Sequence, residues 1–380
     1  MEKRKLFTLL TGMGLVLILV VLPSMAACDE VTISKKRTYN WTMSQPYMPP
    51  NLVHDGAMII VKKAAELSDG RMKIRLYPGD LLGDWTTQAE SVARGEQALA
   101  IGNMSGTLDP RFNALWFTFL NYGGKRFREM FQMGSWFHEL FEPAYRQNNI
   151  KVLGYCYRGT NLGFASKTIF DPDDIDTIRK LKLRMPGIES LIKPWEAIGF
   201  QVMPMPEAEV AVALQTGIID IRGMGNTELT YNKLRDFVKA WYFTREWPNY
   251  KECFISLRIW ESMPKEDQDI LMKAVAYGMD HITNSAERTY EVKFVEKLEK
   301  HGIAVIELSP AQWSRWAQLA RDAQRPIMER VLGKEAVKKF YASADPLPIP
   351  DDSYPVDVVG LKKFQSRWYE NLVKAGKIKP

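Results

Sequence analysis

The sequence predicts a two-lobed α/β protein in which mostly parallel sheets are flanked by helices. Short strand patterns alternate with helical patterns of ordinary length along most of the chain, and such alternation is typical of parallel sheets. Residues 180–220 repeat this order as strand, helix, strand, helix and strand. The helical pattern over residues 264–301 is longer than one lobe needs, so we expect one long helix to span both lobes.

The composition fits a globular protein of this size. The chain has 380 residues, of which 46% are hydrophobic, and it can therefore bury the cores of two lobes. Its formal net charge is +6, and acidic and basic residues are interspersed along the chain. Because no basic segment or patch stands out, we predict no nucleic-acid partner.

The N-terminus has the pattern of a secretory signal peptide over residues 1–27. Basic residues at positions 3–5 precede an uncharged run that ends in small residues before Cys28. The run is long for a signal peptide and short for a membrane span, so an uncleaved anchor is the alternative. Met25-Ala-Ala-Cys28 resembles a bacterial lipobox, and both lipidation of Cys28 and an ordinary cut before it fit the pattern. We expect a location in the periplasm or at the outer face of the cytoplasmic membrane, with membrane contact through the signal or a lipid.

Signals at the ends of each pattern place the elements of the first lobe. Gly70 and Gly95 follow helical patterns, where a left-handed glycine commonly ends a helix. The expected strands are 38–43, 71–77, 98–102 and 152–157, and the expected helices are 51–67, 86–94 and 126–148. We place lobe one at residues 36–158 and about 249–280.

The second lobe is expected at residues 159–248 and about 290–342. Asp171 can cap a helix that begins at Pro172, and the unit at 180–220 follows. Residues 254–259 have the pattern of a strand that returns to the first lobe.

The long helical pattern contains one glycine, Gly278, that weakens it without ending it, and the pattern ends at Gly302. Ser309-Pro310 begins another expected helix, which runs to about residue 331. A C-terminal extension at 343–380 combines a proline-rich stretch with a final helix at 359–375, and it can serve a dimer contact or a lobe.

The sequence contains no motif that assigns a catalytic or metal site. The histidines lie on separate helical segments without paired ligand spacing, and nucleophile-elbow, P-loop and dinucleotide-binding motifs are absent from the sequence. Cys156 and Cys253 lie in apolar strand patterns, so we predict buried free thiols, with a disulfide as the alternative. We therefore predict a binding protein and keep an extracytoplasmic enzyme on the same scaffold as the lesser alternative.

Arg184 is the basic residue whose position points to a ligand. It ends a strand pattern that Pro186 and Gly187 stop, and open α/β sheets bind ligands at the carboxyl ends of their strands. A guanidinium can hold a carboxylate through two parallel hydrogen bonds. A structural salt bridge is the other role that the pattern allows.

Four segments around Arg184 carry a resemblance to a known family. They are Lys180-Leu-Lys-Leu-Arg-Met-Pro186, Trp195-Glu-Ala-Ile-Gly199, Met203-Pro-Met-Pro-Glu207 and Ala213-Leu-Gln-Thr-Gly-Ile-Ile-Asp220. Together they resemble the signature of the solute-binding subunits of TRAP (tripartite ATP-independent periplasmic) transporters, the DctP-like family, over about residues 38–332. The resemblance implies a periplasmic-binding-protein-like fold, type II-like, whose cleft closes on a small organic acid with its carboxylate on Arg184. It also implies delivery to membrane permease subunits, and a sensory receptor with the same lobes is the runner-up.

The chain departs from the family pattern near the expected ligand. Many members have a second arginine where Asn161 stands, while Arg158 lies just before it. Where the family often reads Asp-Gly-Gln-Glu-Asn, this chain has Arg222 and Met224. Other candidates follow from the topology, because they come after expected strands or near the return crossing. The predicted ligand-binding residues are Arg184, Arg222, Asn161, Arg158, Asn103, Gln45, Trp85, Trp247 and Met224.

Some relatives bind their acid together with a calcium ion. This sequence has no local cluster of carboxylates that supports such a site, so we predict no cofactor and keep a ligand-bridging calcium ion as the alternative.

Overall fold

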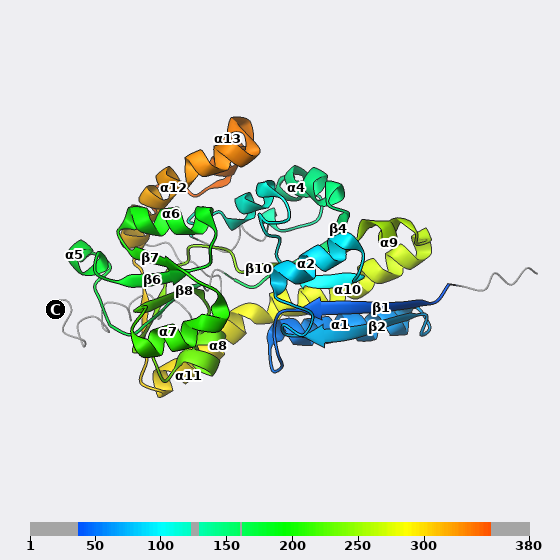
Figure 1. Cartoon of the computed structure of the whole chain (residues 1–380), viewed down its shortest axis with the longest axis horizontal. Coiled ribbons are helices and arrows are strands. Elements are labelled where there is room, and N and C mark those ends of the chain that lie inside the picture. The colour runs from blue at the N-terminus through cyan, green and yellow to red at the C-terminus, as the bar shows by residue number, and fades with distance from the viewer. Residues whose placement is uncertain (1–36, 123–128, 160–161, 351–380) are drawn as a thin grey trace, which may run out of the picture. The chain divides into compact units, whose positions relative to one another are not determined.

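The strands of the computed structural model form two sheets, shown in Figure 1; the structure describes residues 37–122, 129–159 and 162–350. The first sheet has the order β2-β1-β3-β10-β4 and the second has the order β11-β9-β5-β8-β6-β7. The strands of the first sheet are β1 (Tyr39–Gln45), β2 (Met72–Pro78), β3 (Leu99–Gly102), β4 (Ile150–Tyr157) and β10 (Tyr250–Ser256). Those of the second are β5 (Gly163–Ser166), β6 (Lys182–Met185), β7 (Gln201–Pro204), β8 (Ile221–Gly225), β9 (Ala240–Phe243) and β11 (Ala304–Glu307).

Each sheet is parallel except at one strand of the described chain. In the first sheet β10 runs antiparallel to β3 and β4, and in the second β5 runs antiparallel to β8 and β9. Each of these strands is the first one after the chain crosses from the other sheet. The predicted two-lobed, mostly parallel α/β fold is therefore confirmed.

Capping residues set the ends of helices in the first lobe. α1 (Leu52–Leu67) begins after Asn51, whose Oδ1 accepts from the Val53 amide at 2.9 Å. α2 (Trp85–Arg94) ends at Gly95, which has φ 79°. The remaining elements of this part are η1 (Pro110–Trp116), α4 (Trp136–Gln147) and α9 (Leu257–Glu261).

The helix expected over residues 126–148 is shorter than predicted. Gly134 has φ 76° and interrupts it, and Ser135 then caps α4 by accepting from the His138 amide at 3.1 Å. A left-handed residue cannot continue a right-handed helix, so the N-terminal part of this prediction was wrong. Residues 123–128 lie outside the described part of the chain.

Two further boundaries differ from the sequence prediction. Asp171 accepts from the Asp173 amide in a turn, and α5 (Ile175–Ile178) is capped instead by Asp174. The strand expected at residues 254–259 is β10, which runs from Tyr250 to Ser256 and is buried throughout, while residues 257–261 form α9. The charged Lys251 and Glu252 are the reason why the sequence pattern did not include the start of this strand. The shift places Lys251 within the first sheet.

The long helix is continuous but contains a π-helical segment. It comprises α10 (Lys265–Glu287), the π-helical η4 (Arg288–Lys293) and α11 (Phe294–Lys300). α10 packs against α1 and β4, whereas α11 packs against β11 and α8 (Thr227–Leu229), so the helix spans both lobes as predicted. Gly278 does not break it: a Cβ there would lie 2.4 Å from the Gly56 carbonyl oxygen, and the glycine allows α10 to touch α1.

The unit at residues 180–220 forms as the sequence predicts. β6, α6 (Glu189–Ile198), β7 and α7 (Val210–Thr216) lead directly into β8, with η2 (Glu207–Glu209) between β7 and α7. η3 (Thr230–Leu234) follows α8, and α12 (Pro310–Leu332) begins with a capping box between Ser309 and Gln312. α13 (Lys334–Ser343) packs on α12.

The sequence analysis also made predictions about the two cysteines and about a membrane anchor. Cys156 and Cys253 are buried free thiols, as expected. Within the described ranges no helix is both long and apolar enough to cross a membrane. The predicted signal peptide with Cys28, and the predicted helix at 359–375, lie outside those ranges.

Candidate functional site

The carboxyl edge of the first sheet gathers two buried cations. Arg158 follows the end of β4, and Asn103 follows the end of β3. Because β10 is antiparallel, with Glu252 opposite Gly102, the neighbouring Lys251 lies at this same edge. Ligands of open α/β sheets bind outside such edges.

Lys251 and Arg158 are held by neutral groups around Tyr47. The Lys251 ammonium donates to Asn103 Oδ1 and lies 5.9 Å from the centroid of the Tyr47 ring. Arg158 Nη1 donates to Tyr47 Oη at 3.1 Å. The exposed fractions of Lys251 and Arg158 are only 7% and 1%. Both cations therefore share one tyrosine in a buried position.

Burial and neighbouring charges shift the pKa values of Lys251 and Tyr47. Burial lowers the pKa of Lys251, Arg158 lowers it further, and Tyr47 acts in the opposite direction. Burial alone would raise the pKa of Tyr47, yet Lys251 and Arg158 together bring it below its ordinary value. The site thus has an excess of positive charge that stabilises negative groups nearby.

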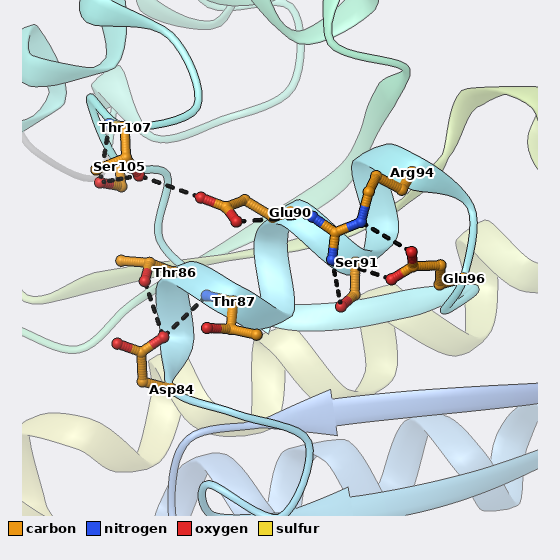
Figure 2. Close-up of polar contacts among 9 residues, drawn as sticks. All are labelled: Asp84, Thr86, Thr87, Glu90, Ser91, Arg94, Glu96, Ser105 and Thr107. Atoms are coloured by element: carbon orange, nitrogen blue, oxygen red, sulfur yellow. Dashed lines mark hydrogen bonds and ion pairs between the residues drawn. The ribbon is translucent and has the colours of Figure 1, made fainter.

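Polar contacts with α2 fix the loop that follows β3. Asp84 caps α2 by accepting from the Thr87 amide at 2.9 Å, as Figure 2 shows. Thr107 Oγ1 lies 3.4 Å from Glu90 Oε1 on that helix and 3.0 Å from Ser105 Oγ. The contact between Thr107 and Glu90 thus attaches the loop that carries Asn103 and Ser105 to α2.

Gln45 supports Tyr47 rather than facing outward. Its Nε2 donates to the Tyr47 carbonyl oxygen at 2.6 Å, and its Oε1 accepts from the Tyr47 amide at 2.8 Å. Gln45 is fully buried. The predicted residue is thus at the predicted edge, where it holds the tyrosine between the two cations.

Aromatic side chains form a wall that joins two of the predicted residues. Trp116 lies between Trp85 and Trp247, with ring centroids 5.5 Å and 4.9 Å away. Trp247 Nε1 donates to the Leu115 carbonyl oxygen at 3.1 Å, and the Trp247 ring lies 5.0 Å from that of Tyr250. Trp116 was not among the predicted site residues, and its spacing in a short 3-10 helix gives no signal in the sequence.

The second sheet presents a pair of arginines. Arg184 on β6 and Arg222 on β8 are register partners, and both are buried. One oxygen of Glu207 accepts from Arg184 Nη1 and from Arg222 Nη2, each at 3.0 Å. Arg184 Nε also donates to the Met205 carbonyl oxygen at 2.9 Å. Arg184 therefore does form an ion pair within the chain, one of the two roles that the sequence allowed.

This pair keeps unused capacity for an anion. Arg222 Nε and Nη1 are buried and have no hydrogen-bond partner among the described residues. The Glu207 side chain is 40% exposed. Burial lowers the pKa of Arg184 to about 10, and Arg222 contributes in the same direction while Glu207 opposes it. Burial opposes ionisation of Glu207, but Arg222 and Arg184 outweigh it and lower its pKa.

Local backbone geometry sets the position of Arg222. A Cβ at Gly225 would lie 2.2 Å from Arg222 Nη1, so glycine alone leaves room for the guanidinium. Met224 is half-buried beside it and has φ 57°. Asn161, the remaining predicted residue, lies outside the described part of the chain.

Hydrogen bonds connect α8, the short helix after β8, with the surroundings of the first lobe. Asn51 Nδ2 donates to Glu228 Oε2 at 2.7 Å. Thr227 Oγ1 donates to the Tyr290 carbonyl oxygen at 2.6 Å, and Arg158 Nε donates to the Tyr290 hydroxyl at 3.1 Å. The chain segment that begins at Arg222 thus reaches the surroundings of Arg158.

The described residues offer no metal-binding group of three or more histidine, cysteine or acidic side chains. Besides Trp116, two residues of the candidate site were absent from the sequence prediction. Lys251 precedes the strand that the sequence predicted at residues 254–259, whereas it lies inside β10 in the structure. Glu207 belonged to a segment that carried the family resemblance, but its side chain was not predicted to contact Arg184.

The comparisons with known proteins agree with this architecture. The model of the DctP family, bacterial extracellular solute-binding protein family 7, matches residues 44–330. The sialic acid-binding periplasmic protein SiaP of Vibrio cholerae is 24% identical over 296 residues, which are 76% of this chain and 88% of that protein.

Solved structures of TRAP periplasmic solute-binding proteins share the fold. One from Ochrobactrum anthropi, whose C-terminus is bound in the ligand-binding pocket, has a TM-score of 0.70 at 21% identity, covering 88% of this chain and 98% of that one. One from Chromohalobacter salexigens with bound D-glucuronate has a TM-score of 0.72 at 18% identity, covering 80% and 99%. The predicted family and extracytoplasmic location are confirmed. The chain belongs to bacterial extracellular solute-binding protein family 7, the solute-binding proteins of TRAP transporters.

Proposed function

We propose that this protein captures a small organic acid between its lobes and delivers it to the membrane permease subunits of a TRAP transporter. The relative from Vibrio cholerae is named for sialic acid, and the structure from Chromohalobacter salexigens holds D-glucuronate. Both ligands are acids. We therefore expect this chain to have a binding site for a carboxylate.

The arginine pair of the second sheet carries the proposal. Arg184 and Arg222 already hold one carboxylate oxygen between them, which supports a geometry suited to this group. The unpartnered Nε and Nη1 of Arg222 are buried, and an unmade hydrogen bond costs about 1–3 kcal/mol per buried group. A solute carboxylate would accept hydrogen bonds from these donors. The partly exposed Glu207 can keep its own bonds to the two arginines or be displaced by the solute.

Closure of two lobes around the acid accounts for the rest of the architecture. We assign lobe one to residues 36–158 and about 249–280, and lobe two to residues 159–248 and about 290–342. Two crossings and the long helix carry the chain between the lobes, and we infer that closure bends the backbone at these places. The signal peptide and lipidation of Cys28 stay predictions, as does the role of residues 343–380.

A thermal-shift screen of organic acids tests this function. A ligand at a hundred times its dissociation constant stabilises a protein by about 2.7 kcal/mol, which shifts the melting temperature measurably. We expect Arg184→Ala and Arg222→Ala to abolish the shift for an acid that binds the original protein. Arg179→Ala, which removes an exposed arginine of the same lobe, should leave it intact.

Two results would count against the proposal. One is an unchanged shift in both arginine variants, because the acid would then bind elsewhere. The other is chemical turnover of the bound acid, which would favour the enzyme alternative over a transport receptor.

A further inference from the structure

Glu246 lies on the segment that returns the chain from β9 to β10, and its side chain is fully buried. We propose that Glu246 is a specificity-determining residue of the carboxylate site. When an acid binds at Arg184 and Arg222, the carboxyl of Glu246 takes up one proton from solvent and donates it in a hydrogen bond to a carboxylate oxygen of the acid. The inference rests on the proposed function and adds that binding is coupled to proton uptake.

Unpartnered polar atoms are the first observation. Glu246 Oε2 accepts from the Thr244 hydroxyl, whereas Glu246 Oε1 has no hydrogen-bond partner among the described residues. Arg222 Nε and Nη1 and Trp241 Nε1 likewise have none within that part of the chain, and all these atoms are buried. A buried polar atom without a hydrogen bond is unfavourable, so a group of them indicates the place of a polar ligand.

The position of these atoms is the second observation. Arg222 Nη1 and Trp241 meet at Gly225, where a Cβ would lie 2.2 Å from the former and 3.2 Å from the ring of the latter. Arg222 is also close enough to Glu246 to favour its ionised form. The unpartnered atoms are therefore grouped around Arg222, the residue that we assign to the solute carboxylate.

The backbone around Glu246 is held on both sides, which is the third observation. The Glu246 carbonyl oxygen accepts from the Phe119 amide at 2.5 Å. The preceding residue, Arg245, is fixed by its buried ion pairs, and the following residue, Trp247, stacks on Trp116. The carboxyl therefore cannot turn to solvent without breaking these contacts, and it must meet a bound acid in its buried position.

The protonation of Glu246 should change when an acid binds. Burial raises the pKa of Glu246 to about 7, although a hydrogen bond from Thr244 and the charges of Arg222 on β8 and Arg245 on its own segment act in the opposite direction. A solute carboxylate nearby is a like charge, so it raises the pKa of Glu246 further. The protonated carboxyl has an O–H group to donate, whereas two ionised carboxylates would repel each other. Binding should therefore take up a proton above about pH 7 and almost none at about pH 6.

Calorimetric titration in buffers that differ in ionisation enthalpy counts the protons taken up for each acid bound. The probes are D-glucuronate, sialic acid and butyrate, whose carboxyl groups are ionised at both pH values of the test, about 6 and about 8. We expect an uptake of more than about half a proton at the higher pH and less than about 0.2 at the lower one. The affinity should fall about five- to tenfold from the lower pH to the higher one.

Glu246→Gln removes the titrating group and keeps a side chain of the same size. Its amide is neutral at both pH values, can donate to the acid and can still accept from Thr244. We expect its proton uptake at about pH 8 to be close to zero and its affinity to change by less than about twofold between the two pH values. Glu252→Gln is the matched control, because burial raises the pKa of Glu252 to about 8 in the first sheet, and it should retain the proton uptake.

The outcomes distinguish this inference from the proposed function. If an acid binds to the original protein without proton uptake at about pH 8, the role of Glu246 is refuted and the receptor function stands; this measurement needs no variant. Uptake that persists in a folded Glu246→Gln would also refute the role. Glu207 does not give the same signal, because its pKa is lowered and a displaced, exposed carboxylate stays ionised at these pH values. If no acid binds at all, both proposals fail.

Discussion

Arg184 and Arg222 are register partners on β6 and β8, and both donate to the same oxygen of Glu207. Two buried like charges on neighbouring strands repel each other, and the carboxylate between them reduces that repulsion. The chain therefore holds the two guanidinium groups in place with a carboxylate of its own. We expect this arrangement to set how strongly a solute acid binds.

Replacing Glu207 by glutamine tests the competition between the chain and the solute. Glu207→Gln removes the negative charge while it keeps an oxygen that can accept from the arginines. We expect monocarboxylates to bind about tenfold more tightly, because the pair regains its full charge for the solute. Calorimetric titration would measure the change.

Glu209→Gln is the matched control for this variant. Glu209 is exposed in the same short turn, and we expect no change in affinity there. If Glu207→Gln binds acids less tightly than the original protein, Glu207 helps to hold the ligand, and the idea of competition is wrong.

Arg245 should make a large contribution to stability. Its Nη1 donates to Glu291 Oε1 and its Nη2 to Glu307 Oε2, each at 2.7 Å, and all three side chains are buried. Glu291 belongs to the π-helical turn of the long helix, so the group ties the return crossing to that helix. Arg245→Ala would leave two buried carboxylates unpaired, and we expect a loss of about 3–5 kcal/mol in urea-induced unfolding.

Arg258→Ala removes an exposed arginine of α9 and provides the comparison. Its free energy of unfolding should change by no more than about 0.5 kcal/mol. A loss below about 1 kcal/mol in Arg245→Ala would mean that the group contributes little to stability.

Glu252 should make stability depend on pH. Burial raises its pKa to about 8, although a hydrogen bond from Tyr145 and the charge of Lys251 act in the opposite direction. Because the pKa is higher in the folded than in the unfolded protein, the contribution of Glu252 is greatest at acidic pH and is lost as pH rises towards about 8. Glu252→Gln stays neutral and can still accept from Tyr145, so its stability should fall less between pH values of about 5 and 8.

Urea unfolding at a series of pH values would measure this difference. Glu335→Gln changes an exposed glutamate of α13 and should retain the pH dependence of the original protein. An identical dependence in Glu252→Gln would show that Glu252 is ionised in the folded state.

Local patterns predicted most elements but failed where one residue changes the backbone. The end of a helix at the left-handed Gly95 was predicted from the sequence because the effect of this glycine is confined to a single turn. Gly134 lay within an apparently amphipathic pattern, and its positive φ decided the end of that helix. Asp174 is the N-cap instead of the predicted Asp171. An aspartate suits this position at either place, so the sequence alone does not distinguish the two.

The candidate site was predictable only in part, for a similar reason. Arg184 was found because it ends a strand in a segment with a family resemblance. Trp85 and Trp247 were predicted singly, whereas their connection through Trp116 depends on three distant segments. Contacts of this kind leave no periodic trace in the chain.

The sequence by itself determined the two-lobed α/β class, the family and the arginine at the end of β6, because these follow from periodicity, end signals and a contiguous motif. Only the tertiary structure decided that Glu207 bridges two arginines and that Lys251 meets Asn103, from which it is separated by 148 positions. The physical reason is the sheet order. An antiparallel β10 between β3 and β4 brings a buried lysine to the edge where their carboxyl ends meet, and no local propensity encodes that neighbourhood.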